Sequence, residues 1–228
     1  MGNVGSPTIA QSIGLDDSLL VDCDGQRLHR DVIGPWRTLQ ASASSAGFEL
    51  AIASAYRSYD RQLRIWNEKA EGIRPVLDGR GQALAVEHLD DSELLFAILR
   101  YSALPGASRH HWGTDVDIYD RSAVDADYVV QLTEAEVDRG GPFAPMHDWL
   151  DAQFAADQLA GFFRPYCGQN ALAAERWHLS YRPVADVFVQ VLRPEQLYQH
   201  YEQAQGLALR QVVLDNFDVI YRDYICCE

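Results

Sequence analysis

The order of the predicted secondary structure elements limits the fold more than any other feature of this sequence. Three short segments, residues 48–54, 114–119 and 177–181, have the apolar or alternating pattern of β-strands. Segments with helical periodicity separate them, and strands and helices do not alternate regularly, as they would around a parallel α/β sheet. The sequence therefore predicts an α+β fold.

Helices are predicted from apolar periodicity and from residues that commonly cap helix ends. They are expected near Asp31, after Ser58, near Asp91, over residues 146–162 and through the tail from residue 194. No internal repeat and no long linker divides the 228 residues. We therefore expect a single domain over residues 1–228, with a core of about residues 48–182 that carries the motifs described below and a helical tail at about 194–225.

The net charge argues against two classes of partner. The chain has 19 Lys and Arg against 33 Asp and Glu, a net charge of −14. Such a surplus of negative charge repels nucleic acid and anionic membrane surfaces, so we expect no nucleic-acid partner. No apolar run approaches the roughly 18 residues of a membrane span. Residues 1–14 show neither the basic head nor the apolar run of an export signal.

Two short segments, residues 108–117 and 175–178, combine residue types that bind metal ions. A catalytic zinc ion takes three ligands from His, Asp, Glu or Cys and leaves a fourth position for water. His110 and Asp117 can converge if the chain reverses between them, and Gly113 supplies the backbone freedom for that reversal. A structural interpretation stays open, in which Asp117 caps a turn.

The second segment offers a third ligand, His178, and a free carboxylate, Glu175. Residues three positions apart on a regular strand face opposite sides, so we expect an irregular turn that brings both to one site. A carboxylate beside a metal ion can take a proton from bound water, as a hydrolase requires.

Taken together and in this order, the motifs resemble those of zinc peptidases of peptidoglycan, the family that includes VanY-type D-alanyl-D-alanine carboxypeptidases, L,D-carboxypeptidases and D,D-dipeptidases. That family carries SxHxxGxxxD, then ExWH, and upstream a YRS motif followed by Gln. Here they read Ser108-x-His110-x-x-Gly113-x-x-x-Asp117, Glu175-x-Trp177-His178, and Tyr56-Arg57-Ser58 with Gln62. The resemblance covers about residues 48–182. It implies a small, mainly antiparallel sheet with flanking helices and a zinc site in a cleft on the sheet.

The resemblance also implies a role for each matching residue. His110, Asp117 and His178 would hold Zn²⁺. Glu175 would act as general base and then as general acid.

Three further residues would bind substrate. Arg57 would bind either the terminal carboxylate of the substrate or the oxyanion of the tetrahedral intermediate. Ser108 would hydrogen-bond the bound peptide, assisted by Gln62. The sequence departs from the family at Asp115, where a small residue is common, and His111 offers a second imidazole beside the expected ligand. Family spacing favours His110.

The implied function is that of a zinc-dependent peptidase in the cell envelope that trims peptidoglycan stem peptides, as a carboxypeptidase releasing terminal D-alanine. The same residues serve endopeptidases and D,D-dipeptidases, and residues 72–107 are long enough to decide substrate length. The choice between D,D and L,D bonds stays open. A non-catalytic, zinc-stabilised module that binds cell-wall peptides is a further alternative, but it has no need of Glu175.

Overall fold

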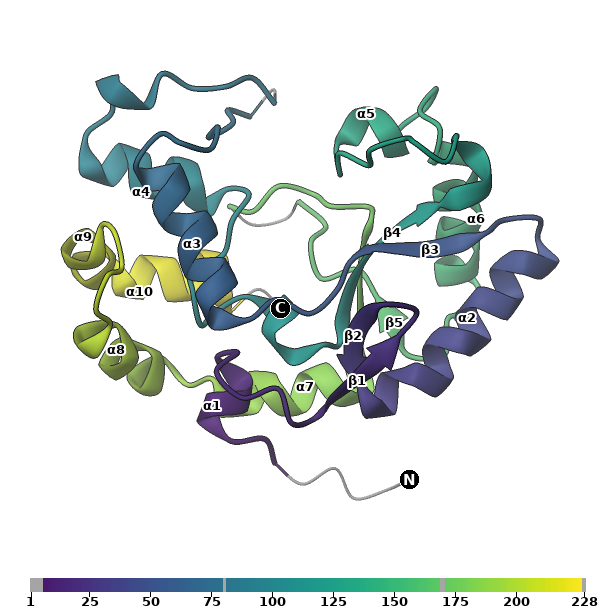
Figure 1. Ribbon diagram of the computed structural model, residues 1–228, viewed down its shortest axis with the longest axis horizontal. Coiled ribbons are helices and arrows are strands. Elements are labelled where there is room, and N and C mark those ends of the chain that lie inside the picture. Colours follow the sequence, from purple (N-terminus) through teal and green to yellow (C-terminus); the bar gives the residue numbers. More distant parts are fainter. Residues whose placement is uncertain (1–5, 80, 169–170, 227–228) are drawn as a thin grey trace.

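A four-stranded antiparallel sheet lies between two groups of helices in the computed structural model, which describes residues 6–79, 81–168 and 171–226 (Figure 1). Its strand order is β3-β4-β6-β5. The strands are β3 (Leu50–Ser54), β4 (Asp115–Asp120), β6 (His178–Tyr181) and β5 (Phe162–Phe163). A separate antiparallel hairpin, which the sequence did not predict, is formed by β1 (Leu20–Cys23) and β2 (Gln26–His29).

Alternation along β4 gives the sheet an apolar and a polar face. Val116 and Ile118 are fully buried in one hydrophobic cluster with Leu179 of β6. Trp36 and Met146 belong to the same cluster, so their helices, α2 (Ile33–Ser45) and α6 (Ala144–Ala155), cover the apolar face. The polar face of β4 and β6 turns away from this core and is available for a site.

A second hydrophobic cluster joins most of the remaining helices, which lie on the opposite side in Figure 1. Its large buried side chains include Trp66, Leu95, Phe188, Tyr201 and Phe217. These come from α3 (Tyr59–Ala70), α4 (Asp91–Leu99), α7 (Arg182–Val191), α8 (Pro194–Gln203) and α10 (Phe217–Ile220). The described residues also contain the short helices α1 (Ile9–Ser12), α5 (Glu134–Val137) and α9 (Arg210–Asp215).

The α+β class and the mainly antiparallel sheet are confirmed, and several helix ends fall where the sequence placed them. Ser58 caps α3 by accepting a hydrogen bond from the backbone N–H of Arg61. The helix expected near Asp31 begins instead at Ile33, after a 3₁₀ turn in which the His29 ring accepts from the N–H of Asp31.

The helix predicted over residues 146–162 ends early, at Ala155. Asp157, Ala160 and Gly161 all have positive φ, so the chain leaves the right-handed helical region and Phe162 enters β5 instead. The helical tail is likewise divided, because Leu209 has a φ of 60° immediately before α9. The described residues of segment 72–90 form a loop with a short 3₁₀ turn at Val86–His88.

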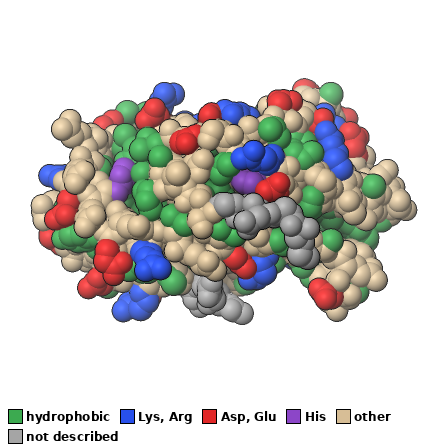
Figure 2. Space-filling model, turned by 90° about the horizontal axis from the view of Figure 1, so that it is seen from below, with side chains coloured by type: hydrophobic (Ala, Val, Ile, Leu, Met, Phe, Trp, Pro, Cys, Tyr) green, Lys and Arg blue, Asp and Glu red, His purple; other side chains and the backbone are tan. Residues whose placement is uncertain are grey.

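Figure 2 shows acidic and basic side chains interspersed over one face of the molecule, without a continuous basic patch on that face. In the part of the chain that the structure describes, no helix has the length and apolar character needed to cross a membrane.

Candidate active site and metal centre

The register of two strands brings the candidate site residues together. Asp117 on β4 lies directly opposite His178 on β6, and Asp115 lies opposite Ser180. All four side chains are buried, and they share the polar face of the sheet because side chains alternate along each strand. These four side chains of β4 and β6 form a polar surface on the sheet, here called the platform.

His110 reaches this platform from the 3₁₀ turn at Arg109–Trp112, which precedes β4. Gly113 ends the turn with a φ of +67°, and a Cβ there would lie 2.5 Å from a methyl carbon of Leu20. Glycine is therefore required both by the left-handed backbone and by the close approach of the hairpin. The chain reversal expected between His110 and Asp117 is confirmed.

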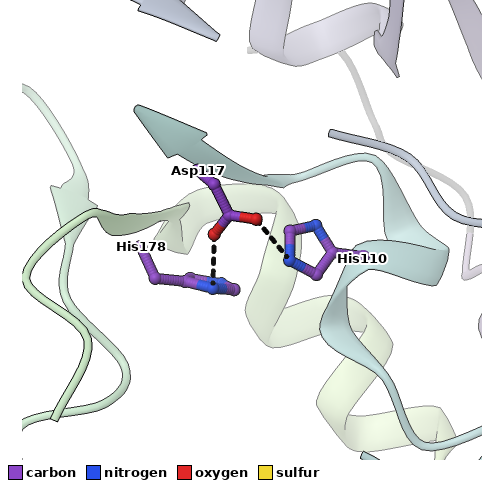
Figure 3. A group of neighbouring side chains, drawn as sticks. All are labelled: His110, Asp117 and His178. Carbon is purple, nitrogen blue, oxygen red and sulfur yellow. Dashed lines mark ion pairs between the residues drawn. The ribbon is translucent and has the colours of Figure 1, made fainter. Parts of the chain in front are cut away.

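His110, Asp117 and His178 each offer one ligand atom, and these atoms lie within 4.8 Å of one another (Figure 3). His110 Nε2 is 3.3 Å from Asp117 Oδ2, and His178 Nδ1 is 3.3 Å from Asp117 Oδ1. Both rings are held from behind, His110 by Nδ1 at 2.8 Å from the carbonyl oxygen of Ala55 and His178 by Nε2 at 2.9 Å from Asp115.

Two atoms of this group are buried without a hydrogen-bond partner, Asp117 Oδ1 and His178 Nδ1. When the outer nitrogen of each ring carries the proton, the inner nitrogen turns a lone pair toward the Asp117 carboxylate. Lone pairs that face one another in a buried space are satisfied by a cation. The donor set of two imidazoles and one carboxylate therefore fits a metal ion.

The pKa shifts of the three candidate ligands show how burial and neighbouring charges set their protonation before a metal ion binds. Burial lowers the pKa of His110 to about 4, which keeps the ring neutral and able to bind a metal ion. Burial raises the pKa of Asp117, but the adjacent His110 and His178 lower it by more, so the carboxylate is ionised. Burial also lowers the pKa of His178, but the hydrogen bond to Asp115 and the negative charge of Asp117 more than offset this and leave it well above the ordinary value, so a metal ion must displace a proton from this ring.

Glu175 approaches the group through the irregular turn that the spacing predicted. The N–H of His178 donates to the Glu175 carbonyl oxygen at 3.2 Å, which folds the chain back by one turn. Glu175 Oε2 then lies 3.4 Å from His178 Nδ1, with 20% of the side chain exposed. The carboxylate is thus beside the three ligand atoms and open to the cavity.

Arg57 enters the same space from the segment after β3. Its backbone N–H donates to the carbonyl oxygen of His110 at 3.0 Å. This bond ties the segment to the 3₁₀ turn at Arg109–Trp112, here called the ligand turn. Burial lowers the pKa of Arg57, while the nearby Asp117 and Glu175 favour its charge. Gln62 is fully buried behind it, accepting from Arg57 Nη1 at 2.8 Å and donating to Ala103 O at 2.6 Å. Gln62 therefore holds the guanidinium rather than lining the cavity.

A cavity of about 550 Å³ opens over the group. Arg57, Ser108 and Glu175 line it together with the three candidate ligands. Sequence reasoning missed several of the other lining residues, among them Tyr101, Leu132, Glu134 and Tyr166. The Tyr166 ring lies 4.7 Å from the His178 ring, but no local pattern marks it, because its position depends on the path of a long connection.

The sequence assigned no role to Asp115 or His111, and the structure places both side chains outside the cavity. Asp115 is fully buried behind His178 and does not line the cavity. His111 points away from the group, with Nδ1 2.6 Å from Arg57 O and Nε2 accepting from the N–H of Gly106 at 3.0 Å. His110, rather than His111, therefore faces Asp117.

Comparison with known proteins places this geometry in a family. Residues 25–184 match the family described as VanY, D-alanyl-D-alanine carboxypeptidase. An uncharacterized protein of Haemophilus influenzae is 30% identical over 122 residues, which cover 54% of this chain and 92% of that protein. Another from the same organism is 44% identical over 77 residues, covering 34% of this chain and 53% of that protein.

Solved structures show the same fold. VanYB in complex with D-alanine-D-alanine is 20% identical, covers 85% of this chain and 87% of that one, and has a TM-score of 0.52. A vancomycin resistance D,D-pentapeptidase VanY variant in complex with Zn(II) is 21% identical, with 85% and 88% covered and a TM-score of 0.50. The LdcB LD-carboxypeptidase is 24% identical, with 88% and 74% covered and a TM-score of 0.50. Because the family match spans more than half of the sequence, the chain belongs to the VanY family of D-alanyl-D-alanine carboxypeptidases.

Proposed function

We propose that this protein is a zinc-dependent peptidase of the cell envelope that trims peptidoglycan stem peptides, acting as a carboxypeptidase that releases terminal D-alanine. Its motif-bearing core and helical tail would form one peptidase domain. The observation that carries the proposal is the position of Glu175, a carboxylate open to the cavity and 3.4 Å from a ring nitrogen of the candidate ligand set.

His110, Asp117 and His178 would hold the zinc ion. Two imidazole nitrogens and one carboxylate are common ligands of a catalytic zinc, and three protein ligands leave a position open. When bound, the ion lowers the pKa of a coordinated water to about 7 and polarises the scissile carbonyl. The two unpartnered buried atoms of the group support this assignment.

Glu175 would handle the proton. Its carboxylate stands beside the ligand atoms rather than among the three that converge on one point. It is therefore free to take a proton from the attacking water and to pass that proton to the departing amine. A module that only binds peptides would gain nothing from a partly exposed carboxylate in this position, so the enzyme is the better interpretation.

Arg57 and Ser108 would bind the substrate. The guanidinium lines the cavity together with Glu175 and is held in place by Gln62. A planar, doubly donating cation suits the terminal carboxylate of a peptide, or the oxyanion that forms during the attack. Ser108 lines the same cavity and would donate to the bound peptide.

Product analysis tests the proposal. The zinc-loaded protein is incubated with muropeptides that carry tripeptide, tetrapeptide and pentapeptide stems, and the released fragments are identified by mass spectrometry. We expect the pentapeptide to yield a tetrapeptide and free D-alanine. Release of the dipeptide D-alanyl-D-alanine would favour a D,D-dipeptidase, and cleavage of cross-linked stems would favour an endopeptidase. Binding of muropeptides without any cleavage would favour the non-catalytic module.

A further inference from the structure

Asp115 is a buried carboxylate that the proposed reaction does not use. Its side chain is fully buried, and it stands two residues before Asp117 on the same face of β4. A buried carboxylate costs several kcal/mol unless it is paired and hydrogen-bonded, so its surroundings should show how that cost is offset.

Four side-chain groups surround the Asp115 carboxylate, two at each oxygen. Arg109 Nε lies 2.8 Å from Oδ1, and His178 Nε2 lies 2.9 Å from the same oxygen. The hydroxyls of Thr114 and Ser180 donate to Oδ2 at 2.6 and 2.9 Å. A carboxylate accepts about four hydrogen bonds, so both oxygens of Asp115 are fully used.

Arg109 supplies the compensating charge and closes the network. Its Nη2 donates to Ser180 Oγ at 2.7 Å, so Arg109, Asp115 and Ser180 form a closed ring of hydrogen bonds. The guanidinium lies 4.8 Å from the centre of the Trp112 ring and 5.5 Å from that of Phe163. Asp115 is thus fixed by Thr114 just before its own strand, by His178 and Ser180 of the strand opposite, and by Arg109 of the turn at Arg109–Trp112.

This fixed carboxylate determines which nitrogen of the His178 ring carries the proton and which faces Asp117. Because Asp115 Oδ1 can only accept, Nε2 of His178 must carry a proton, and the lone pair of a neutral ring lies on Nδ1, which faces Asp117. We propose that Asp115, held by Arg109, Thr114 and Ser180, is a positioning residue that sets the tautomer and orientation of His178 as a metal ligand. The proposal rests on the zinc site of the proposed function and adds to it a residue that is none of the three proposed ligands.

Metal affinity tests this role without relying on turnover. Zinc dissociation constants of the wild type and of Asp115→Asn are measured by competition with a chromophoric chelator. Asn keeps the size and one acceptor but removes the charge, and we expect 10- to 100-fold weaker binding, the usual effect of losing an outer partner of a ligand. Asp120→Asn is the matched control, because Asp120 is a buried carboxylate on the same strand that bonds to Glu49 and Ser122 and contacts none of the ligands. It should change zinc affinity less than threefold.

A spectroscopic readout separates positioning from general damage to the fold. In the zinc-loaded wild type, ¹⁵N NMR should show His178 protonated at Nε2 and metal-bound through Nδ1, and Asp115→Asn should shift the Nε2 resonance. If Asp115→Asn does not fold, Ser180→Ala and Thr114→Val each remove one donor to Oδ2, and each should weaken zinc binding by a few-fold.

Wild-type zinc affinity in Asp115→Asn, or in both donor variants, would overturn the proposal while leaving the proposed function intact. A wild type that binds zinc but cleaves no muropeptide would instead overturn the function, and the affinity measurement would still decide the role of Asp115.

Discussion

The cavity has two unlike walls. One wall, here called the floor, consists of His110, Asp117, Glu175 and His178 with Arg57, which the sheet and the ligand turn position. The other, here called the rim, consists of Leu77 and Gly81 from segment 72–90 and of residues 132–135 around the start of α5. In Figure 1, segment 72–90 and α5 stand on opposite sides of the same upper edge of the molecule.

The floor and the rim differ in how firmly their side chains are held. On the floor, the rings of His110 and His178 and the guanidinium of Arg57 are each bonded from behind, to Ala55, Asp115 and Gln62. On the rim, Thr133 and Glu134 are exposed, and Leu132 occupies the left-handed region with a φ of 56°. A fixed floor suits chemistry, which tolerates little misplacement, whereas a loop rim suits the selection of substrates.

The largest effect is expected from removing a ligand on the floor. His178→Ala deletes one of three proposed ligands, so bound zinc and turnover should both fall below detection. Elemental analysis of the purified variant measures the zinc. His111→Gln is the control, because His111 is the neighbour of a ligand but points away from the site. It should keep most of its zinc, although the protein will be less stable. Equal zinc in the wild type and in His178→Ala would contradict the ligand assignment.

The second-largest effect is expected from replacing a floor carboxylate by an amide, and the same replacement on the rim serves as its control. Glu175→Gln removes the proposed base from the floor but leaves every ligand, so zinc should stay near the wild-type level while kcat falls by roughly 10²–10⁴-fold. Glu134→Gln makes the same change on the rim, and kcat should change less than threefold. Steady-state kinetics on a pentapeptide-stem substrate compare the two. Near-normal turnover in Glu175→Gln would remove this residue from the mechanism.

The floor was also the part that could be predicted from the sequence. Strand alternation between residues 115 and 119 is local, and alternate side chains of a strand share one face, as Asp115 and Asp117 do. The pairing of Asp117 with His178 joins residues 61 positions apart. Residue type offered His178 as a third ligand, and the family resemblance then implied that it joins the same site. The chain reversal at Gly113 was predictable because the backbone there has a positive φ, which glycine adopts without steric cost.

The rim and the outer contacts were not predictable in the same way. Leu132 and Tyr166 line the cavity because of how long connections run, and no periodicity or motif records such a path. The end of α6 was misplaced because Asp157 and Ala160 adopt positive φ, which is uncommon for residues other than glycine. The bonds that make Asp115 an anchor for His178 cross between strands and depend on the register.

A smaller effect than that of Glu175 is expected at Arg57, where the floor meets the substrate. Lys keeps the charge but cannot offer two parallel donors, so Arg57→Lys should lower kcat/KM by roughly tenfold. Amidation of the substrate carboxylate should slow the wild type strongly and Arg57→Lys by a smaller factor, as a double-mutant cycle would show. Arg61→Lys on the exposed side of α3 is the control. Additive losses would assign Arg57 to the oxyanion, and equal cleavage of free and amidated peptides by the wild type would favour an endopeptidase.

The smallest effect is expected on the rim, at Leu132. Its half-buried side chain lines the cavity, so Leu132→Ala removes apolar contact with the substrate but no group that reacts. The loss of roughly 1 kcal/mol of contact corresponds to about a fivefold rise in KM with kcat unchanged. Val130→Ala is the matched control, since Val130 packs against the same small hydrophobic cluster as Leu132 but does not line the cavity. Both variants should lose similar stability, and only Leu132→Ala should change KM. If Leu132→Ala lowered kcat as strongly as a floor variant, the rim would take part in positioning the reacting groups, and the division of the cavity into a chemical wall and a selective wall would fail.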